Sequence, residues 1–191
     1  MRVLVVVEGK HERDGAVHAL IQRLRPDLAD LDFDRLANSD IHVHHGTGRG
    51  YEKKAIRWMR EAERRGFEAI ILLVDRDKVA QRTTEITNAQ NNTDVCALRR
   101  ALGVAIESFD AWMLADEKAL SRVLAKTVQT QSDPETLADP KDHFTKLLAT
   151  LGVASGGAEL YARIARELDI SRLETRCSQG FGVFAGRLRN M

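Results

Sequence analysis

Four segments in the first half of the chain have hydrophobic patterns that predict β-strands. Val3 to Val7 is an unbroken, mostly β-branched apolar run, as in a strand covered on both faces, and Ala69 to Val74 repeats this pattern. Ile41 to His45 alternates apolar and polar residues, and Val104 to Ile106 is a short apolar run that leads into Glu107. We therefore expect a sheet of about four strands.

The segments between these strands predict helices. Apolar residues recur at helical spacing from His11 to Arg25, and a second helix is expected from about Tyr51 to Arg65, after a glycine-rich turn over 46–50. Asp94 is expected to cap a third helix that carries Val95, Leu98 and Leu102 on one face. The polar segment before it, Gln81 to Thr93, is the best candidate for a mobile flap.

From Glu107 to its end the chain has a helical pattern, which is broken by the polar stretch Gln129 to Asp139. Alternating strands and helices predict an α/β fold with a mainly parallel sheet and helices on both faces. We expect a single domain over 1–191, with a core of about 1–115 and a helical C-terminal extension of about 116–191. Two tryptophans and two phenylalanines are expected to pack in the interior: Trp58, Trp112, Phe181 and Phe184.

Composition narrows the function without deciding it. The 29 Lys and Arg residues balance 28 Asp and Glu residues for a net charge of +1, so attraction to nucleic acid must come from local patches. Cys96 and Cys177 have neither metal-ligand spacing nor a disulfide framework, and the first strand begins too early for a signal peptide. No apolar run approaches the roughly 20 residues that span a membrane, so a cytoplasmic protein without a membrane segment is expected.

Carboxylates follow three of the predicted strands. Glu8 comes after the first, Asp75 and Asp77 after the strand from Ala69, and Glu107 after the last. A single acid there is often a helix cap, but parallel strands end at one edge of the sheet, where ligands bind. Several carboxylates at that edge would repel one another unless a cation neutralised them, and Mg²⁺ prefers such oxygen ligands. We therefore expect Mg²⁺, or Mn²⁺, as a cofactor.

These residues also carry a family resemblance. Glu8-Gly9-Lys10-His11-Glu12 and Asp75-Arg76-Asp77, each after a strand, resemble the two signatures of the TOPRIM domain of topoisomerases, primases and overcoming-lysogenisation-defect (OLD) nucleases. The Glu-Gly-x-x-Glu form is most similar to the OLD branch. The segments 105–112 and 177–181 look like those of small stand-alone TOPRIM-like proteins of unassigned function. The resemblance implies a Rossmann-like TOPRIM fold in which Glu8, Asp75 and Asp77 hold Mg²⁺.

Four further residues are candidates at this edge. Glu12 lies one helical turn after Glu8 and is either a ligand of a second ion or an ordinary acid at a helix start. The same two interpretations apply to Glu107, for which we favour the ligand. Lys10 and Lys78 lie beside the carboxylates, where they are either stabilisers of charge on a phosphate or simple counter-ions.

The expected activity is hydrolysis of DNA or RNA by metal-activated water. A topoisomerase needs a nucleophilic tyrosine, and neither Tyr51 nor Tyr161 lies in a strand-cleaving context. The resemblance further implies a role in antiphage defence beside an ABC- or SMC-type ATPase encoded nearby. One alternative is a non-catalytic module that binds metal or the ATPase. A phosphoacceptor like those of response regulators fits poorly, because Glu8 is followed by Gly-Lys rather than by a second acid.

The second predicted helix offers a surface for nucleic-acid phosphates. Basic residues recur along one face at intervals of three and four residues, at positions 53, 57, 60 and 64. The candidates for phosphate contacts are the basic residues expected nearest the sheet edge, on this helix and in the turn before it: Arg49, Lys53, Lys54 and Arg57. A solvated helix face is the alternative, above all for the distal arginines. The glycine-rich turn is not a P-loop, because no Lys-Ser or Lys-Thr pair follows it.

Overall fold

A single parallel sheet organises the computed structural model. The residues described are 1–10, 12–37, 50–131, 133–153 and 157–191. In them, four strands form a sheet in the order β2-β1-β3-β4: β1 (Arg2–Val7), β2 (Asp30–Arg35), β3 (Ala69–Asp75) and β4 (Arg99–Ala105). All three pairings are parallel, so the strands end at one edge. The predicted α/β fold is confirmed.

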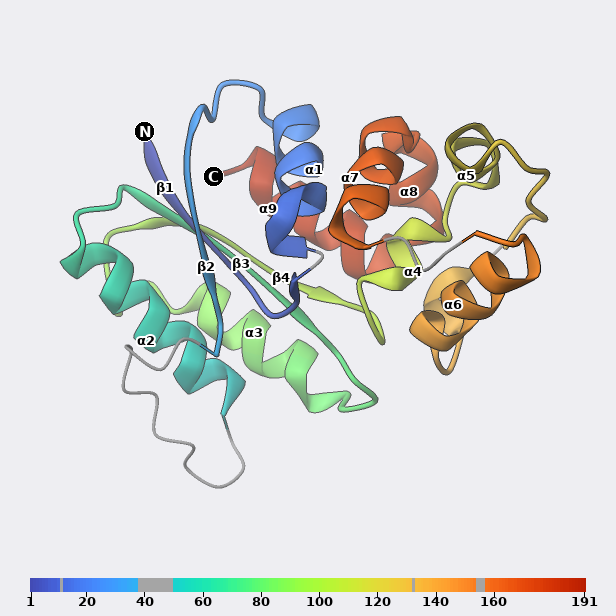
Figure 1. The fold of residues 1–191 in the computed structure, drawn as a ribbon. Coiled ribbons are helices and arrows are strands. Elements are labelled where there is room, and N and C mark those ends of the chain that lie inside the picture. Colours follow the sequence, from blue (N-terminus) through green and yellow to red (C-terminus); the bar gives the residue numbers. More distant parts are fainter. Residues whose placement is uncertain (11, 38–49, 132, 154–156) are drawn as a thin grey trace.

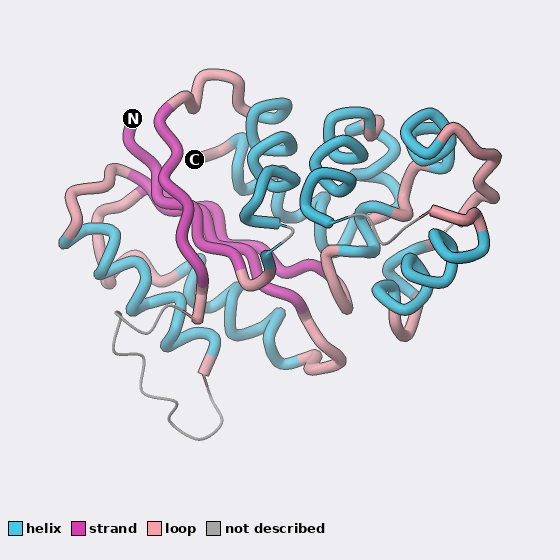
Figure 2. Tube along the Cα trace, in the orientation of Figure 1, coloured by secondary structure: helices cyan, strands magenta, loops and turns pink. Residues whose placement is uncertain are grey.

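Helices cover both faces of this sheet, as Figures 1 and 2 show. One face carries α2 (Tyr51–Arg64) and α3 (Gln81–Asn91), and the other carries η1 (Glu12–Ala16), α1 (Val17–Leu24) and α9 (Val183–Arg189). The remaining helical segments are α4 (Asp110–Met113), α5 (Glu117–Leu124), η2 (Pro134–Thr136), α6 (Pro140–Thr150), α7 (Gly157–Glu167), α8 (Ile170–Arg176) and η3 (Ser178–Gly182). The expected helical extension is therefore present.

The strand sequences explain the two-sided core. In β1, Leu4 and Val6 pack with α2 and α3, whereas Val3, Val5 and Val7 pack with the helices of the other face. All five side chains are fully buried, as expected for a central strand of a parallel sheet whose residues alternate between two covered faces.

The second strand differs from its prediction. The expected strand Ile41 to His45 lies outside the described residues, and the strand that pairs with β1 is β2. Its sequence places an acid at every second position, so it resembles a polar linker. Asp32 pairs with Arg2 at 2.8 Å and Asp34 with Arg65 at 3.1 Å, which offsets the cost of these charges on an edge strand.

Two predictions between β3 and α4 were wrong. Residues 81–93 were expected to form a flap, but 81–91 form α3, and the helix expected after Asp94 is replaced by β4. Helix α3 buries only Ile86 and Ala89, so its sequence has almost no helical periodicity. It is held in place partly by Gln90, which donates to the Arg100 carbonyl at 3.2 Å and accepts from the Leu102 amide at 2.8 Å.

The C-terminal helix α9 packs directly on β4. The ring of Phe184 lies so close to Gly103 that a Cβ at that position would be 2.6 Å from its Cδ2. Phe184 stacks on Trp112, and Phe181 meets the same indole edge-on. The expectation that these aromatic residues are interior is confirmed, and the C-terminal extension is packed against the sheet core.

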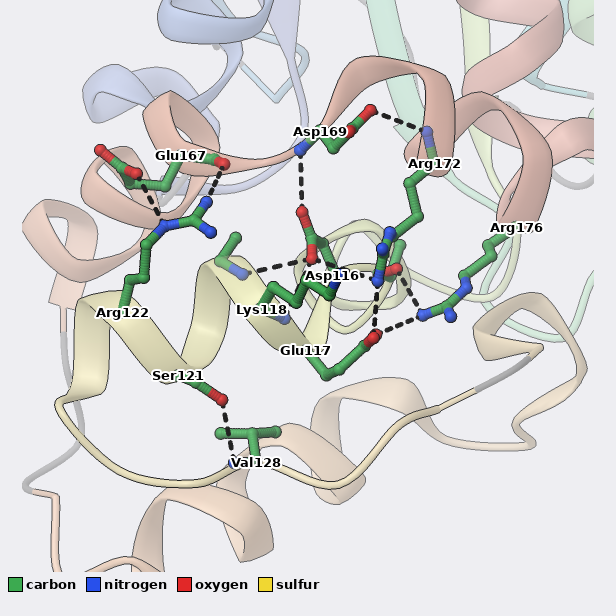
Figure 3. A network of polar contacts seen from close by, with 12 residues as sticks. Asp116, Glu117, Lys118, Ser121, Arg122, Val128, Glu167, Asp169, Arg172 and Arg176 are labelled. Carbon is green, nitrogen blue, oxygen red and sulfur yellow. Dashed lines mark hydrogen bonds and ion pairs between the residues drawn. The ribbon is translucent and has the colours of Figure 1, made fainter.

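A polar network joins the outer helices α5 and α8 (Figure 3). Asp116 caps α5 and also accepts the amide of Asp169 at 2.9 Å. Glu117 lies between Arg172 and Arg176, with 2.6 Å to each guanidinium. Because these charges come from helices far apart in sequence, the network fixes how the helices pack. Within the described ranges, no helix combines the length and apolar character needed to cross a membrane.

Candidate active site

The carboxyl edge of the sheet brings Glu8 and Asp75 together, as the sequence predicts. Strands β1 and β3 are neighbours with Val7 paired to Leu73, so the residues that follow them meet. The backbone amide of Asp75 donates to Glu8 Oε2 at 3.0 Å, and the hydroxyl of Tyr51 donates to Glu8 Oε1 at 2.7 Å. Tyr51 is the first residue of α2, so this helix also begins at the edge.

The turn after β3 carries Asp77 and is braced by Glu107. The amides of Arg76 and Asp77 donate to the carbonyls of Ala105 and Glu107, both at 2.9 Å. Asp77, Lys78 and Glu107 have φ angles of 47°, 61° and 58°, a left-handed conformation that costs energy for residues other than glycine. The Glu107 carboxylate accepts the Lys78 amide at 2.8 Å and also binds the Arg76 guanidinium. Both of its oxygens therefore hold the turn.

Arg82, at the start of α3, is the cation among these carboxylates. Its Nη1 donates to Asp77 Oδ2 at 2.6 Å and to the Asp75 carbonyl at 2.7 Å, and it lies 4.0 Å from Glu8 Oε2. The guanidinium carbon is 4.2 Å from the centre of the Tyr51 ring, a cation–π contact. Sequence reasoning missed Arg82 because its segment was expected to be a loop.

Glu12 is a second carboxylate near Glu8, and it is buried, with 8% of its surface exposed. It accepts the amide of Gly9, where an added Cβ would lie 2.3 Å from Glu12 Oε2, so glycine permits this close approach. Burial raises the pKa of Glu12 to about 7 despite this hydrogen bond, and the charges of Asp110 and Glu8 add to the rise.

The Asp75 carboxyl is in a similar environment. Burial raises its pKa well above the ordinary value, and the negative charge of Glu12 adds to the rise. The amide of Phe109, which donates to Asp75 Oδ1 at 2.8 Å, opposes it, while the charges of Glu8 and Asp77 raise the pKa further. Glu12 and Asp75 thus form an inner acidic pair whose charged forms are disfavoured by burial and by mutual repulsion.

Both tyrosines of the chain lie at this site. Tyr161 of α7 donates its hydroxyl to Asp110, which also accepts from the hydroxyl of Ser108 at 3.2 Å. Burial and the neighbouring carboxylates raise the pKa of both Tyr161 and Tyr51 above the usual value. Both phenols are therefore held protonated, which disfavours a tyrosine nucleophile. In the sequence, the position of Asp110 shortly after β4 is the one sign that it belongs to this site.

The donor chemistry of the edge fits a divalent cation. Mg²⁺ is typically held by one or two carboxylates and several waters, and Glu8 and Asp75 offer such a pair. Within the described part of the chain, no three His, Cys, Asp or Glu side chains are already grouped to hold an ion. Asp77 is bound by Arg82, and Glu107 by the turn. A carboxylate has two oxygens, so Asp77 would serve as a third ligand through Oδ1 while its Oδ2 stays bound to Arg82.

Three lysines lie within two residues of Glu8, Tyr51 or Asp77 in the sequence. Lys10, Lys78 and Lys53 are exposed, which suits counter-ions or phosphate contacts equally. The Lys54 ammonium lies 4.5 Å from the centre of the Tyr51 ring, so this lysine lies next to the acidic edge.

The basic face of α2 has a half near the acidic edge and a half distal to it. Arg57 is partly exposed on the near half of the helix, and Arg49 lies outside the described residues. Arg64, at the distal end, is paired with Glu61 at 2.6 Å, so its charge is used within the helix. The near residues remain the better candidates for phosphate contacts.

Comparison with known proteins gives one match. A family model described as a domain of unknown function, DUF4276, matches residues 7–189. Neither the search of curated proteins nor that of solved structures found a similar protein. The match begins at the end of β1 and includes every site residue described above, so the family extends over the whole acidic edge and the helices behind it.

Proposed function

The chain belongs to the DUF4276 family, and from its acidic edge we propose that it is a Mg²⁺-dependent nuclease that hydrolyses phosphodiester bonds of DNA or RNA. One observation carries the proposal. Glu8 and Asp75 meet at the carboxyl ends of neighbouring parallel strands, and the inner pair Glu12 and Asp75 have pKa values raised by burial and mutual repulsion. Such a cluster is stabilised by a cation.

In this mechanism Glu8 and Asp75 would hold the metal, and Asp77 would join them through Oδ1 while its Oδ2 stays with Arg82. A divalent ion held by these residues would supply an activated water and neutralise charge on the leaving oxygen. Glu12 is the candidate ligand for a second ion. The exposed side chains of Lys10 and Lys78 would contact the scissile phosphate. Tyr51 orients Glu8 through its hydroxyl, while Glu107 positions the turn that carries Asp77.

The substrate backbone is proposed to lie along the first turns of α2, over Arg49, Lys53, Lys54 and Arg57. The TOPRIM resemblance supports an ABC- or SMC-type ATPase as a partner and a cytoplasmic role in antiphage defence. An ATPase would supply the nucleotide-dependent step for which this chain has no P-loop.

A second candidate is a non-catalytic module that binds metal or the ATPase. Two observations favour it: Arg82 already pairs with Asp77, and no three metal-ligating side chains are grouped in the described residues. An internal ion pair of this kind can serve as a stable structural element without turnover.

Cleavage of labelled DNA and RNA separates the two candidates. The wild type is assayed with Mg²⁺, Mn²⁺ or EDTA, alone and with any ABC- or SMC-type ATPase encoded nearby. The proposal expects cleavage that requires the metal and stops in EDTA. Metal-dependent thermal stabilisation without cleavage in any of these mixtures would instead support the interaction module.

A further inference from the structure

Arg82 is anchored through only one of its terminal nitrogens. Nη1 makes the contacts to Asp77 Oδ2, at 2.6 Å, and to the Asp75 carbonyl, at 2.7 Å, and it is also the atom nearest to Glu8. The guanidinium carbon lies over the ring of Tyr51, 4.2 Å from its centre. These contacts hold the guanidinium in place, because it is bound at one nitrogen and packed against an aromatic ring.

The opposite edge of the same guanidinium has no protein partner among the described residues. Nε and Nη2 donate to none of them, and the side chain retains 15% of its surface exposed. In arginine these two nitrogens form a side-on fork, with parallel N–H bonds that match two oxygens of a carboxylate or phosphate. The structure therefore holds this fork beside the acidic edge.

The surrounding charges limit what such a fork can bind. Glu8 and Asp77 repel any anion that approaches without a cation, whereas a phosphate can share its oxygens between a cation and a guanidinium. A phosphodiester presents two non-bridging oxygens in the geometry that the fork matches. The ammonium of Lys54, 4.5 Å from the centre of the same Tyr51 ring, adds positive charge in the same region.

We infer that Arg82 is a phosphate-binding residue that positions a phosphodiester at the carboxyl edge, with Nη1 anchored to Asp75 and Asp77 and the Nε–Nη2 fork directed to the substrate. The inference rests on the proposed function for the substrate class. It assigns Arg82, rather than Lys10 or Lys78, as the main oriented contact to the phosphate.

The test measures binding of unmodified DNA and RNA oligonucleotides by fluorescence anisotropy, with Ca²⁺ in place of Mg²⁺ to limit cleavage during the measurement. Arg82→Ala should weaken binding roughly tenfold to a hundredfold, the effect of losing charge-assisted hydrogen bonds. Arg82→Lys keeps the charge but not the fork, so its affinity should stay close to that of Arg82→Ala. Millimolar guanidinium ion should restore part of the affinity of Arg82→Ala, which a merely structural role would not predict. Melting temperatures verify that each variant is folded.

Arg64→Ala is the matched control, because it removes the same charge from an exposed arginine that is paired with Glu61. It should bind as the wild type does. Wild-type affinity in Arg82→Lys, or unchanged affinity in Arg82→Ala, would overturn the inference, as would absence of binding by the wild type. Arg82-dependent binding without cleavage would overturn the nuclease proposal alone, and cleavage with Arg82-independent binding would overturn this inference alone.

Discussion

Individual carboxylates at the site are in environments that disfavour their charge. Glu12 is almost fully buried and faces Asp110 and Glu8, and Asp75 is surrounded by Glu12, Glu8 and Asp77. A protein retains such repulsion only where the charges have a use or a partner, so uncompensated acids often mark functional sites. The effect of the raised Glu12 pKa on the free energy of unfolding can be measured in the metal-free protein.

Glu12→Gln should stabilise the metal-free protein at high pH. The folded-state pKa of Glu12 is about 7 against an ordinary value of 4.5, so between these pH values the folded state binds more protons and wild-type stability falls as pH rises. Glutamine still accepts the Gly9 amide but carries no charge. The variant should gain on the order of 3 kcal/mol over the wild type at pH 8, and almost nothing near pH 4.5.

Urea unfolding in EDTA at pH 5 and pH 8 measures this difference. Glu63→Gln, at an exposed position of α2, is the matched control. An advantage of Glu12→Gln that is equal at both pH values would contradict the buried, repelled state of Glu12.

At the scale of elements, the sequence predicts those strands and helices whose formation depends on hydrophobic burial alone. The apolar runs of β1 and β3 and the amphipathic α2 were predicted almost to the residue. The edge strand β2 was missed because its aspartates depend on Arg2 and Arg65, and α3 because it buries only Ile86 and Ala89. Both depend on contacts between segments far apart in the chain, which no local pattern contains.

The contact of α9 with β4 gives a prediction for folding stability. Gly103→Ala places a methyl group against the fully buried ring of Phe184, where the added Cβ would lie 2.6 Å from the ring. Overpacking of this kind typically costs about 1–3 kcal/mol. The midpoint of denaturant unfolding should fall accordingly, whereas Gly66→Ala, at a position with open space but positive φ, tests backbone strain alone. Unchanged stability in Gly103→Ala would argue against close packing of α9 on the sheet.

The near half of α2 should contact phosphates rather than bases. Replacing Lys53 and Lys54 by alanine should weaken binding to all sequences alike and reduce the slope of log affinity against log salt by about 2. Replacing Arg60 and Arg64, on the distal half of the same helix, removes equal charge and should leave the slope unchanged. Oligonucleotide titrations at several salt concentrations measure both variants, and equal slopes would identify the near half as a solvated face.

At the scale of the whole molecule, the parallel sheet explains which parts of the site the sequence could predict. Strands that end at one edge bring Glu8 and Asp75 together, so their proximity follows from the strand pattern. Arg82, Tyr51 and Tyr161 join them from helices whose positions depend on packing between distant segments. The carboxylates were therefore predictable, whereas the groups that anchor and neutralise them required the fold.

Cleavage by Glu8→Gln tests the nuclease proposal most directly. Glutamine keeps an acceptor for the Asp75 amide and the Tyr51 hydroxyl, so folding should survive, but it removes the charge of a proposed metal ligand. Labelled DNA and RNA are incubated with wild type and variant in Mg²⁺ or Mn²⁺, with the ATPase supplied. Cleavage should fall by more than the roughly 10- to 100-fold that loss of an outer-shell partner costs, while oligonucleotide binding in EDTA, which we attribute to the basic near half of α2, should be no weaker than that of the wild type. Cleavage by the variant at the wild-type rate would contradict the proposal that this edge is the catalytic site.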